Sequence, residues 1–253
     1  MGTLHHLKVG CADASLIMTD GSFLVDCHRI EEHKSLLPTN KHIRGVFVTH
    51  QHNDHYSGLE FLRREGYTID CLIYSPYERR YDDASVTKEE WDEFAGHRDF
   101  FQSKGTKLFA PFKQESWAKA YWDTNGVQFW VLGPTKHTAQ SDTRELHDAC
   151  LVVKAHIGTR MCLFTGDASD ANLQDVATIN HICDDILHAS HHGSLAGADL
   201  DFIKKCNATY TVVSTESGVY DNVPHPTALK RYKEHTKQRV YRTDEYGTVK
   251  WTF

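Results

Sequence analysis

The sequence predicts a layered fold of β-strands and α-helices, either an α+β protein or an α/β sandwich. Short apolar runs typical of strands are mixed with helical segments without strict alternation, which argues against a barrel. The hydrophobic and charged fractions, 40% and 25%, are ordinary for a globular protein. No repeat, low-complexity segment or Pro/Gly/Ser-rich linker divides the 253 residues. We therefore expect a single domain over residues 1–253.

The expected strands begin near the N-terminus. Residues 15–18 and 22–26 are apolar and flank the sequence TDG, which is typical of a hairpin turn. The run GVFVTH at 45–50 is rich in β-branched and aromatic residues and predicts a buried strand. Further strands are expected at 4–10, 71–75, 106–110, 127–134, 149–158 and 160–167, within 184–193 before a histidine-rich loop, and at 208–215, 239–247 and 248–253.

Two longer helices are expected in the first half of the chain. Residues 57–66 place Leu59 and Leu62 on the inward face and end in a glycine. Residues 87–105 begin with Thr87, a residue type that caps helix N-termini, continue with acidic residues and end in Lys-Gly. Shorter helices are expected at 199–206 and 226–236.

Charge and cysteine usage restrict the class of protein. The formal net charge of −6 means that the whole chain lacks the basic surface of a protein that grips long nucleic acids. Seven scattered cysteines without a C-x-x-C pair indicate reduced thiols, and hence a cytoplasmic protein rather than a disulfide-stabilised one. We find neither a signal peptide nor an apolar run of about 20 residues, so we expect no membrane association.

A dense group of ionisable side chains follows the strand expected at 45–50. The sequence THQHNDHYSGL places His50, His52, Asp54 and His55 within six positions. Residues two apart on an extended segment point to the same face, so His50 and His52 can present two nitrogens to one cation. Asp54 and His55 can offer a carboxylate and a nitrogen to a second cation. Imidazole and carboxylate suit zinc, iron or manganese, and this density of ligands disfavours the alternative of an incidental polar loop.

Two other expected strands end in potential ligands. The sequence LFTGDAS at 163–169 places Asp167 just beyond a strand, where an acid at a sheet rim can bridge two cations. An aspartate in an ordinary turn is the alternative interpretation. The sequence LHASHHGS at 187–194 ends in His191 and His192. We expect one of these histidines to bind metal and the other to support the ligands or face a substrate.

With these motifs, the sequence resembles the metallo-β-lactamase superfamily. THQHNDHYSGL is close to the T-H-x-H-x-D-H-x-x-G-L signature of that family, LFTGD resembles its fourth motif, and FLVDC its first. The nearer resemblance is to the hydrolase domain of ComEC-type DNA-uptake channels and its free-standing relatives. It rests on LKVGCADASLI, in which Asp13 is kept, on ASHHGS, and on VPHPTALKRYKE with VYRTDEYGTVKW. The resemblance extends from about residue 4 to the C-terminus and implies an α/β fold, the four-layer αββα sandwich, with metals at one sheet edge.

The resemblance also implies two divalent metal ions, with Zn²⁺ preferred and Mn²⁺ or Fe as alternatives. His50 and His52 would bind one ion. Asp54 and His55 would bind the other, and Asp167 would bridge the two.

The remaining ligands are chosen between neighbouring histidines. His191 is preferred over His192, because the histidine of an H-x-G-[ST] turn is the ligand in several members of the superfamily, and His192 would then face the substrate. His147 is preferred over His137 as the ligand that precedes the strand leading to the bridging aspartate. Asp26 is expected only to support the ligands.

The predicted function is a metal-dependent hydrolase, a phosphodiesterase or nuclease-like enzyme acting on a nucleotide or nucleic-acid phosphoester. Two cations that share a water lower its pKa from about 16 towards roughly 7, which supplies a hydroxide nucleophile. Asp54 would orient this nucleophile, and His192 and His225 are the candidates for protonating the leaving group. The substrate is expected to be a small molecule, a nucleotide or a short strand. The alternatives are hydrolysis of a lactam, lactone or thioester carbonyl, and a non-catalytic metal-binding module. The sequence leaves the oligomeric state open.

Overall fold

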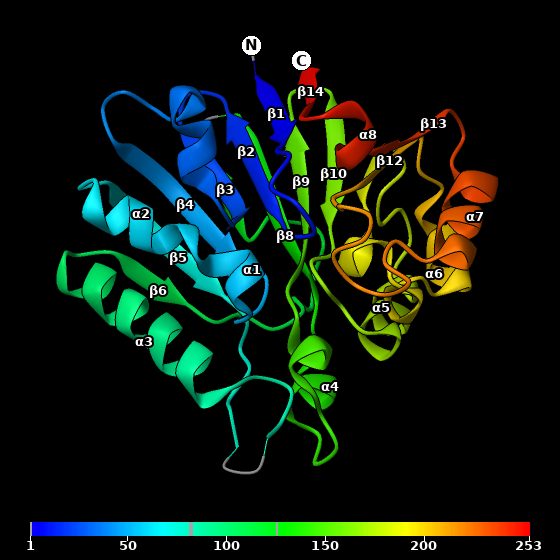
Figure 1. Ribbon diagram of the computed structural model, residues 1–253, viewed down its shortest axis with the longest axis horizontal. Coiled ribbons are helices and arrows are strands. Elements are labelled where there is room, and N and C mark those ends of the chain that lie inside the picture. The colour runs from blue at the N-terminus through cyan, green and yellow to red at the C-terminus, as the bar shows by residue number, and fades with distance from the viewer. Residues whose placement is uncertain (1, 81–82, 125) are drawn as a thin grey trace.

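Two seven-stranded β-sheets form the centre of the structure, and helices cover their outer faces (Figure 1). The computed structural model describes residues 2–80, 83–124 and 126–253. Apolar side chains from both sheets fill the layer between them, and the rings of Phe47 and Phe129, one from each sheet, lie 4.7 Å apart. One further apolar core lies between the first sheet and its helices, and another lies between the second sheet and its helices. The predicted four-layer αββα sandwich is therefore confirmed.

The first sheet combines antiparallel and parallel pairing. β14, β1, β2 and β3 are antiparallel neighbours, whereas β3, β4, β5 and β6 run parallel. Parallel neighbours need crossover connections, and helical segments supply them here. In sheet order, the strands are β14 (Val249–Thr252), β1 (Thr3–His6), β2 (Ala14–Met18), β3 (Ser22–Cys27), β4 (His42–Val48), β5 (Thr68–Tyr74) and β6 (Lys107–Phe109).

The second sheet repeats this mixture. β13, β12, β11 and β10 run parallel, whereas β10, β9, β8 and β7 are antiparallel. The carboxyl ends of parallel strands meet at one edge of a sheet, so the loops after β10, β11 and β12 lie together. In sheet order, the strands are β13 (Arg239–Arg242), β12 (Tyr210–Val213), β11 (Ile186–His188), β10 (Arg160–Phe164), β9 (Val152–Ile157), β8 (Val127–Gly133) and β7 (Trp122–Thr124).

The helices form the outer layers and the connections. α3 begins as the sequence predicts, because the Thr87 side chain accepts a hydrogen bond from the Glu90 amide and the Glu90 carboxylate accepts one from the Thr87 amide. The α-helices are α1 (Asn53–Tyr56), α2 (Gly58–Arg64), α3 (Lys88–Ser103), α4 (Lys136–Gln140), α5 (Asp170–Ala177), α6 (Leu200–Cys206), α7 (Pro226–His235) and α8 (Thr243–Tyr246). The 3₁₀ segments are η1 (Ile30–Leu36), η2 (Leu146–Ala149), η3 (Ser190–Gly193) and η4 (Leu195–Gly197).

Several strands are shorter than the sequence pattern indicates, and two of them show the reason. The strand expected at 4–10 ends at His6, because the chain then turns irregularly before β2 begins at Ala14. The strand expected at 239–247 ends at Arg242, because the following residues form α8. Both corrections arise where a β-rich sequence meets a turn that long-range contacts impose.

Two expectations about the environment of the protein can be compared with the structure. All seven cysteines are free thiols. Within residues 2–80, 83–124 and 126–253, every helix is too short or too polar to cross a membrane.

Candidate metal centre

Segments that lie far apart in the sequence converge at one edge of the two sheets. From the first sheet, the segment after β4 carries His50 and His52, and α1 carries Asp54 and His55. From the second sheet, η2 carries His147, the turn after β10 carries Asp167, and η3 carries His191 and His192. Strand ends therefore position most of these side chains, as expected for a site on open sheets.

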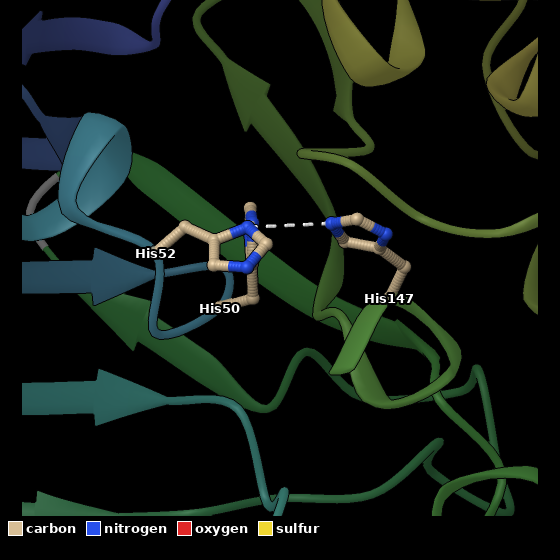
Figure 2. Close-up of side chains that lie close together, drawn as sticks. All are labelled: His50, His52 and His147. Carbon is tan, nitrogen blue, oxygen red and sulfur yellow. Dashed lines mark hydrogen bonds between the residues drawn. The ribbon is translucent and has the colours of Figure 1, made fainter. Parts of the chain in front are cut away.

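The first ligand cluster contains three imidazoles and one carboxylate. The Nδ1 atom of His52 lies 3.0 Å from Nε2 of His50 and 3.4 Å from Nε2 of His147. Figure 2 shows the three rings pointing toward one another. The Oδ2 atom of Asp167 lies 3.8 Å from Nε2 of His50 and 4.0 Å from Nε2 of His147. Four ligands at about 2.1 Å around a tetrahedral ion are about 3.4 Å apart, so this spacing suits one cation.

The second ligand cluster adjoins the first through Asp167. The other oxygen of this residue, Oδ1, lies 3.3 Å from Nε2 of His55 and 3.5 Å from Nε2 of His192. Asp54 closes the cluster, with Oδ2 3.5 Å from His192 Nε2 and Oδ1 3.9 Å from His55 Nε2. Since each oxygen of Asp167 faces a different cluster, its carboxylate has the geometry of a bridge between two cations.

Asp167 reaches this position because Gly166 precedes it. Gly166 has a φ of +47°, and a Cβ atom there would lie 2.4 Å from Oγ1 of Thr49 and 2.8 Å from Sγ of Cys150. A side chain would therefore push the end of β10 away from the loop after β4. The glycine allows the two sheets to approach closely at the site.

Hydrogen bonds hold several of the imidazoles in the orientation that metal binding requires. His55 Nδ1 donates to Asp26 Oδ2 at 2.9 Å, His52 Nε2 to the carbonyl oxygen of Ser85 at 2.7 Å, and His192 Nδ1 to that of Ser214 at 3.1 Å. In each ring, the other nitrogen faces the cluster and is the atom that would offer its lone pair to a cation. Asp26 is itself fixed by Thr49, whose amide and hydroxyl groups each donate to it at 2.8 Å.

The electrostatic environments of the two clusters differ. Burial lowers the pKa of His50 well below its usual value and that of His147 to about 3, so both rings are neutral at pH 7. Burial has the same tendency at His55 and His192, but the charges of Asp167 and its neighbouring carboxylates outweigh it and raise both pKa values well above usual. Burial opposes ionisation of Asp167, yet His192 and His55 hold its pKa well below the usual range.

Buried polar atoms without partners provide a test of whether a cation fits. Within the described part of the chain, His55 Nε2, His192 Nε2 and Asp167 Oδ1 are buried and have no hydrogen-bond partner. Such atoms are costly unless something satisfies them. All three point to the same place in the second cluster, so the residues present fit a divalent cation there.

Comparison with known proteins agrees with this arrangement. Residues 18–108 match the family model described as the metallo-beta-lactamase superfamily. Among solved structures, the metallo-beta-lactamase fold protein YhfI from Bacillus subtilis superposes with a TM-score of 0.61 at 16% identity, covering 99% of each chain. The chain has the metallo-β-lactamase superfamily fold. No curated protein sequence is significantly similar to it.

Other structures with the metallo-β-lactamase fold differ in their chemistry. CmlA, described as a diiron β-hydroxylase from Streptomyces venezuelae, has a TM-score of 0.62 and 12% identity; the match covers 100% of this chain but 54% of CmlA. A structure described as a new diphosphatase from the PhnP family has a TM-score of 0.52 and 15% identity, covering 100% of this chain and 98% of its own. At these identities, the likeness shows the fold alone.

The structure brings both consecutive histidines of η3 to the ligand clusters. The His192 side chain is 4% exposed and lies in the second cluster, whereas that of His191 is 29% exposed. His191 Nε2 lies 3.6 Å from Oδ2 of Asp167, and its ring stands beside that of His147. Both residues have φ values near +50°, and this left-handed backbone turns the second ring inward. The geometry therefore suits His192 as a ligand of the second cluster, whereas His191 lies within ligand distance of the first cluster and is the more exposed of the two.

Two further expectations concern histidines outside the clusters. His137 is exposed on α4, so His147 rather than His137 joins the first cluster. His225 caps α7: its Nδ1 accepts a hydrogen bond from the Thr227 amide at 3.1 Å, and its own amide donates to the carbonyl oxygen of Gly193 in η3 at 2.9 Å. Because Nδ1 is the acceptor in this cap, Nε2 carries the proton of the neutral ring, and the expected role of His225 as a proton donor stays a prediction.

A cavity of about 330 Å³ opens onto the two ligand clusters. Besides the ligands and His191, it is lined by Glu90, Tyr220 and Val223. Tyr220 is 56% exposed in the loop between β12 and α7, and no motif of the sequence points to it. Asp13 and His188, which lie behind the second cluster, were also not assigned a role from the sequence. Only the resemblance of LKVGCADASLI to a family motif pointed to Asp13.

Proposed function

We propose that this protein is a metal-dependent hydrolase that cleaves a small phosphoester, with a nucleotide as the expected substrate. The observation that carries the proposal is the pair of adjoining ligand clusters that share the carboxylate of Asp167. When bound, two divalent cations would activate a water molecule and neutralise charge on a phosphoryl oxygen. Zn²⁺ is the preferred ion because imidazoles dominate the first cluster, and Mn²⁺ or Fe are the alternatives.

The ligand set follows the geometry of the clusters. The first cation would be held by His50, His52, His147 and Asp167. The second would be held by Asp54, His55, His192 and Asp167. Relative to the expectation from sequence, His192 replaces His191 as the ligand.

Three side chains of the cavity are placed to act on the water or the substrate, and one of them is the ligand Asp54. Asp54 lines the cavity, and a carboxylate there can accept a hydrogen bond from the attacking water and orient it. His191 lines the same cavity with an exposed ring and is the candidate for protonating the leaving group. Partial burial, and next the charge of Asp54, raise the pKa of Tyr220, so its hydroxyl keeps a proton to donate to a phosphoryl oxygen.

The charge of the neighbouring surface supports a small substrate. A second cavity of about 330 Å³ shares Asp54, Glu90 and Tyr220 with the first, so the two are continuous. Its further lining includes Glu216 and Arg29. The carboxylates outnumber the guanidinium group, and a long polyanion would be repelled here. A nucleotide or a short single strand is easier to accommodate than duplex DNA.

Two further lines of support concern the class of reaction and the location. The resemblance to the ComEC-type domains, through LKVGCADASLI and ASHHGS, favours phosphoester chemistry. A structure described as a diphosphatase has the same fold. The free thiols favour a reducing, cytoplasmic location.

The test compares two chromogenic substrates on the metal-loaded full chain. We expect hydrolysis of bis-p-nitrophenyl phosphate that is abolished by chelation, restored by Zn²⁺ or Mn²⁺, and lowered at least about a thousandfold in Asp167→Asn, because metal ions contribute several kcal/mol to the transition state. Asp20→Asn, at an exposed turn between β2 and β3, is the matched control and should be fully active.

The other outcomes separate the alternatives. Turnover of a chromogenic lactam, lactone or thioester without turnover of the phosphodiester would assign a carbonyl hydrolase. Two bound cations with activity on neither substrate would assign a non-catalytic metal-binding module.

A further inference from the structure

Asp13 lies behind the second ligand cluster, in the irregular segment between β1 and β2. It is 1% exposed. Its amide donates to the carbonyl oxygen of Asp54 at 3.1 Å, and its own carbonyl oxygen accepts from the His28 amide at 3.1 Å. The adjacent carbonyl oxygen of Ala12 accepts from the hydroxyl group of Ser214, at 2.7 Å, in the second sheet. The segment is therefore fixed to the loops of both sheets.

The carboxylate of Asp13 is surrounded by imidazoles but has no hydrogen bond to them. Oδ1 lies 3.5 Å from Nε2 of His188 and 3.6 Å from Nδ1 of His192, and Oδ2 lies 3.9 Å from Nδ1 of His55. Among the residues that the structure describes, neither oxygen has a hydrogen-bond partner. Asp13 thus acts on its neighbours as a charge rather than as an acceptor.

The two nearest ligand rings already have other acceptors for their Nδ1 protons. His192 donates to the carbonyl oxygen of Ser214, and His55 donates to Asp26. Asp13 is therefore not needed to set their orientation.

A buried carboxylate without hydrogen bonds is costly unless positive charge lies nearby. On one side of Asp13, the ring of His188 is stacked on that of His6 at 5.0 Å, and both rings are buried. On the other side are His55 and His192, two ligands of the same cluster. Positive charge at that cluster would stabilise Asp13, and by reciprocity Asp13 would stabilise the cation.

We propose that Asp13 is a positioning residue of the second cation site, where its charge behind His55 and His192 strengthens binding of that ion and leaves the first ion unaffected. The inference rests on the metal centre of the proposed function. It goes beyond the ligand set because Asp13 does not line the cavity in the described structure and faces the backs of the ligands. In metalloproteins, supporting residues of this kind typically change metal affinity 10–100-fold.

The experiment measures metal binding rather than hydrolysis. The full chain is stripped of metal and titrated with Co²⁺, whose absorbance spectrum distinguishes successive sites, and calorimetry gives the two affinities. In Asp13→Asn, we expect the first ion to bind as in the wild type and the second about 10–100-fold more weakly. Asp13→Glu keeps the charge and should retain most of the second affinity. Asp20→Asn is the control for loss of a carboxylate elsewhere.

Each other outcome overturns the inference. Unchanged affinity for the second ion in Asp13→Asn would show that the charge of Asp13 does not affect metal binding. An equal loss of affinity for both ions would indicate a general structural defect. The same holds if Asp13→Asn is unfolded by circular dichroism while Asp13→Glu is folded, because the fold itself would then require the carboxylate. A wild-type chain that binds fewer than two ions would overturn the proposed metal centre as well, whereas intact phosphodiesterase activity with an unaffected second ion would overturn only the role of Asp13.

Discussion

The two ligand clusters share Asp167 but prepare for a cation in opposite ways. In the first cluster, burial keeps His50 and His147 neutral, so their nitrogens are free to bind metal without releasing protons. In the second cluster, carboxylates surround His55 and His192 and favour their protonated forms, so a cation must displace protons. The comparison teaches that identical side chains become different sites through the charges packed around them.

The largest expected effects come from removing one ligand from each cluster. His147→Gln should lower the affinity for the first ion, and His192→Gln should lower the affinity for the second. Each loss should exceed about 100-fold, the upper end of the effect of a residue that only supports a ligand. His191→Gln should keep both ions and lower kcat about 100-fold, because general acid catalysis contributes at least this much. Calorimetric metal titration and steady-state kinetics measure the two quantities.

The exposed histidine of α4 offers a matched control for these variants. His137→Gln should leave metal binding and kcat unchanged. If His191→Gln lost an ion while His192→Gln kept both, the assignment drawn from the left-handed backbone of η3 would be wrong.

The contrast between the clusters should also appear in the stability of the metal-stripped chain. The pKa of His192 is raised in the folded state relative to its value of about 6.5 in the unfolded chain. Its contribution to the free energy of unfolding is therefore fully present below about pH 6.5 and is lost as the pH rises through the folded-state pKa. The pKa of His147 is lowered to about 3 in the folded state. Its contribution to the free energy of unfolding is therefore present above about pH 6.5 and is lost as the pH falls towards about 3.

Urea denaturation at pH 5.5 and 8.5 measures these opposite slopes. His192→Gln should reduce the free energy of unfolding more at pH 5.5 than at pH 8.5, whereas His147→Gln should reduce it more at pH 8.5. Parallel pH dependence in the two variants would contradict the contrast between the clusters.

The smallest expected effect concerns the side chain that covers the second cluster. Tyr220→Phe removes one hydroxyl that we place on a phosphoryl oxygen, so kcat/KM should fall about fivefold, the value of one hydrogen bond of about 1 kcal/mol. Metal affinity should not change. Tyr246→Phe, a similarly exposed tyrosine on α8, is the control. Equal kinetics in the two variants would remove Tyr220 from the reaction.

The sequence was most informative where the site is local. His50, His52, Asp54 and His55 lie within six positions at a strand end, and the spacing alone predicts that they point into one site. The four-layer fold was likewise predictable, through the resemblance that those motifs carry. Periodicity alone gave only a layered mixture of strands and helices.

The rest of the site depends on contacts that no local pattern records. Which of His191 and His192 turns inward is decided by positive φ angles at two successive residues that are not glycine, a conformation that sequence does not announce. The capping role of His225 depends on where α7 begins. Asp13 reaches the second cluster only because two segments meet across the two sheets. One is the segment between β1 and β2, and the other is the segment that follows β11.

Each cluster draws two of its ligands from the N-terminal half of the chain and two from the C-terminal half. His50 and His52 meet His147 and Asp167, while Asp54 and His55 meet Asp167 and His192. A nascent chain that has left the ribosome only as far as α4 thus carries half of each site and cannot hold either ion tightly. The proposed cations would therefore be bound late in folding, and they would link the two sheets as a covalent cross-link does.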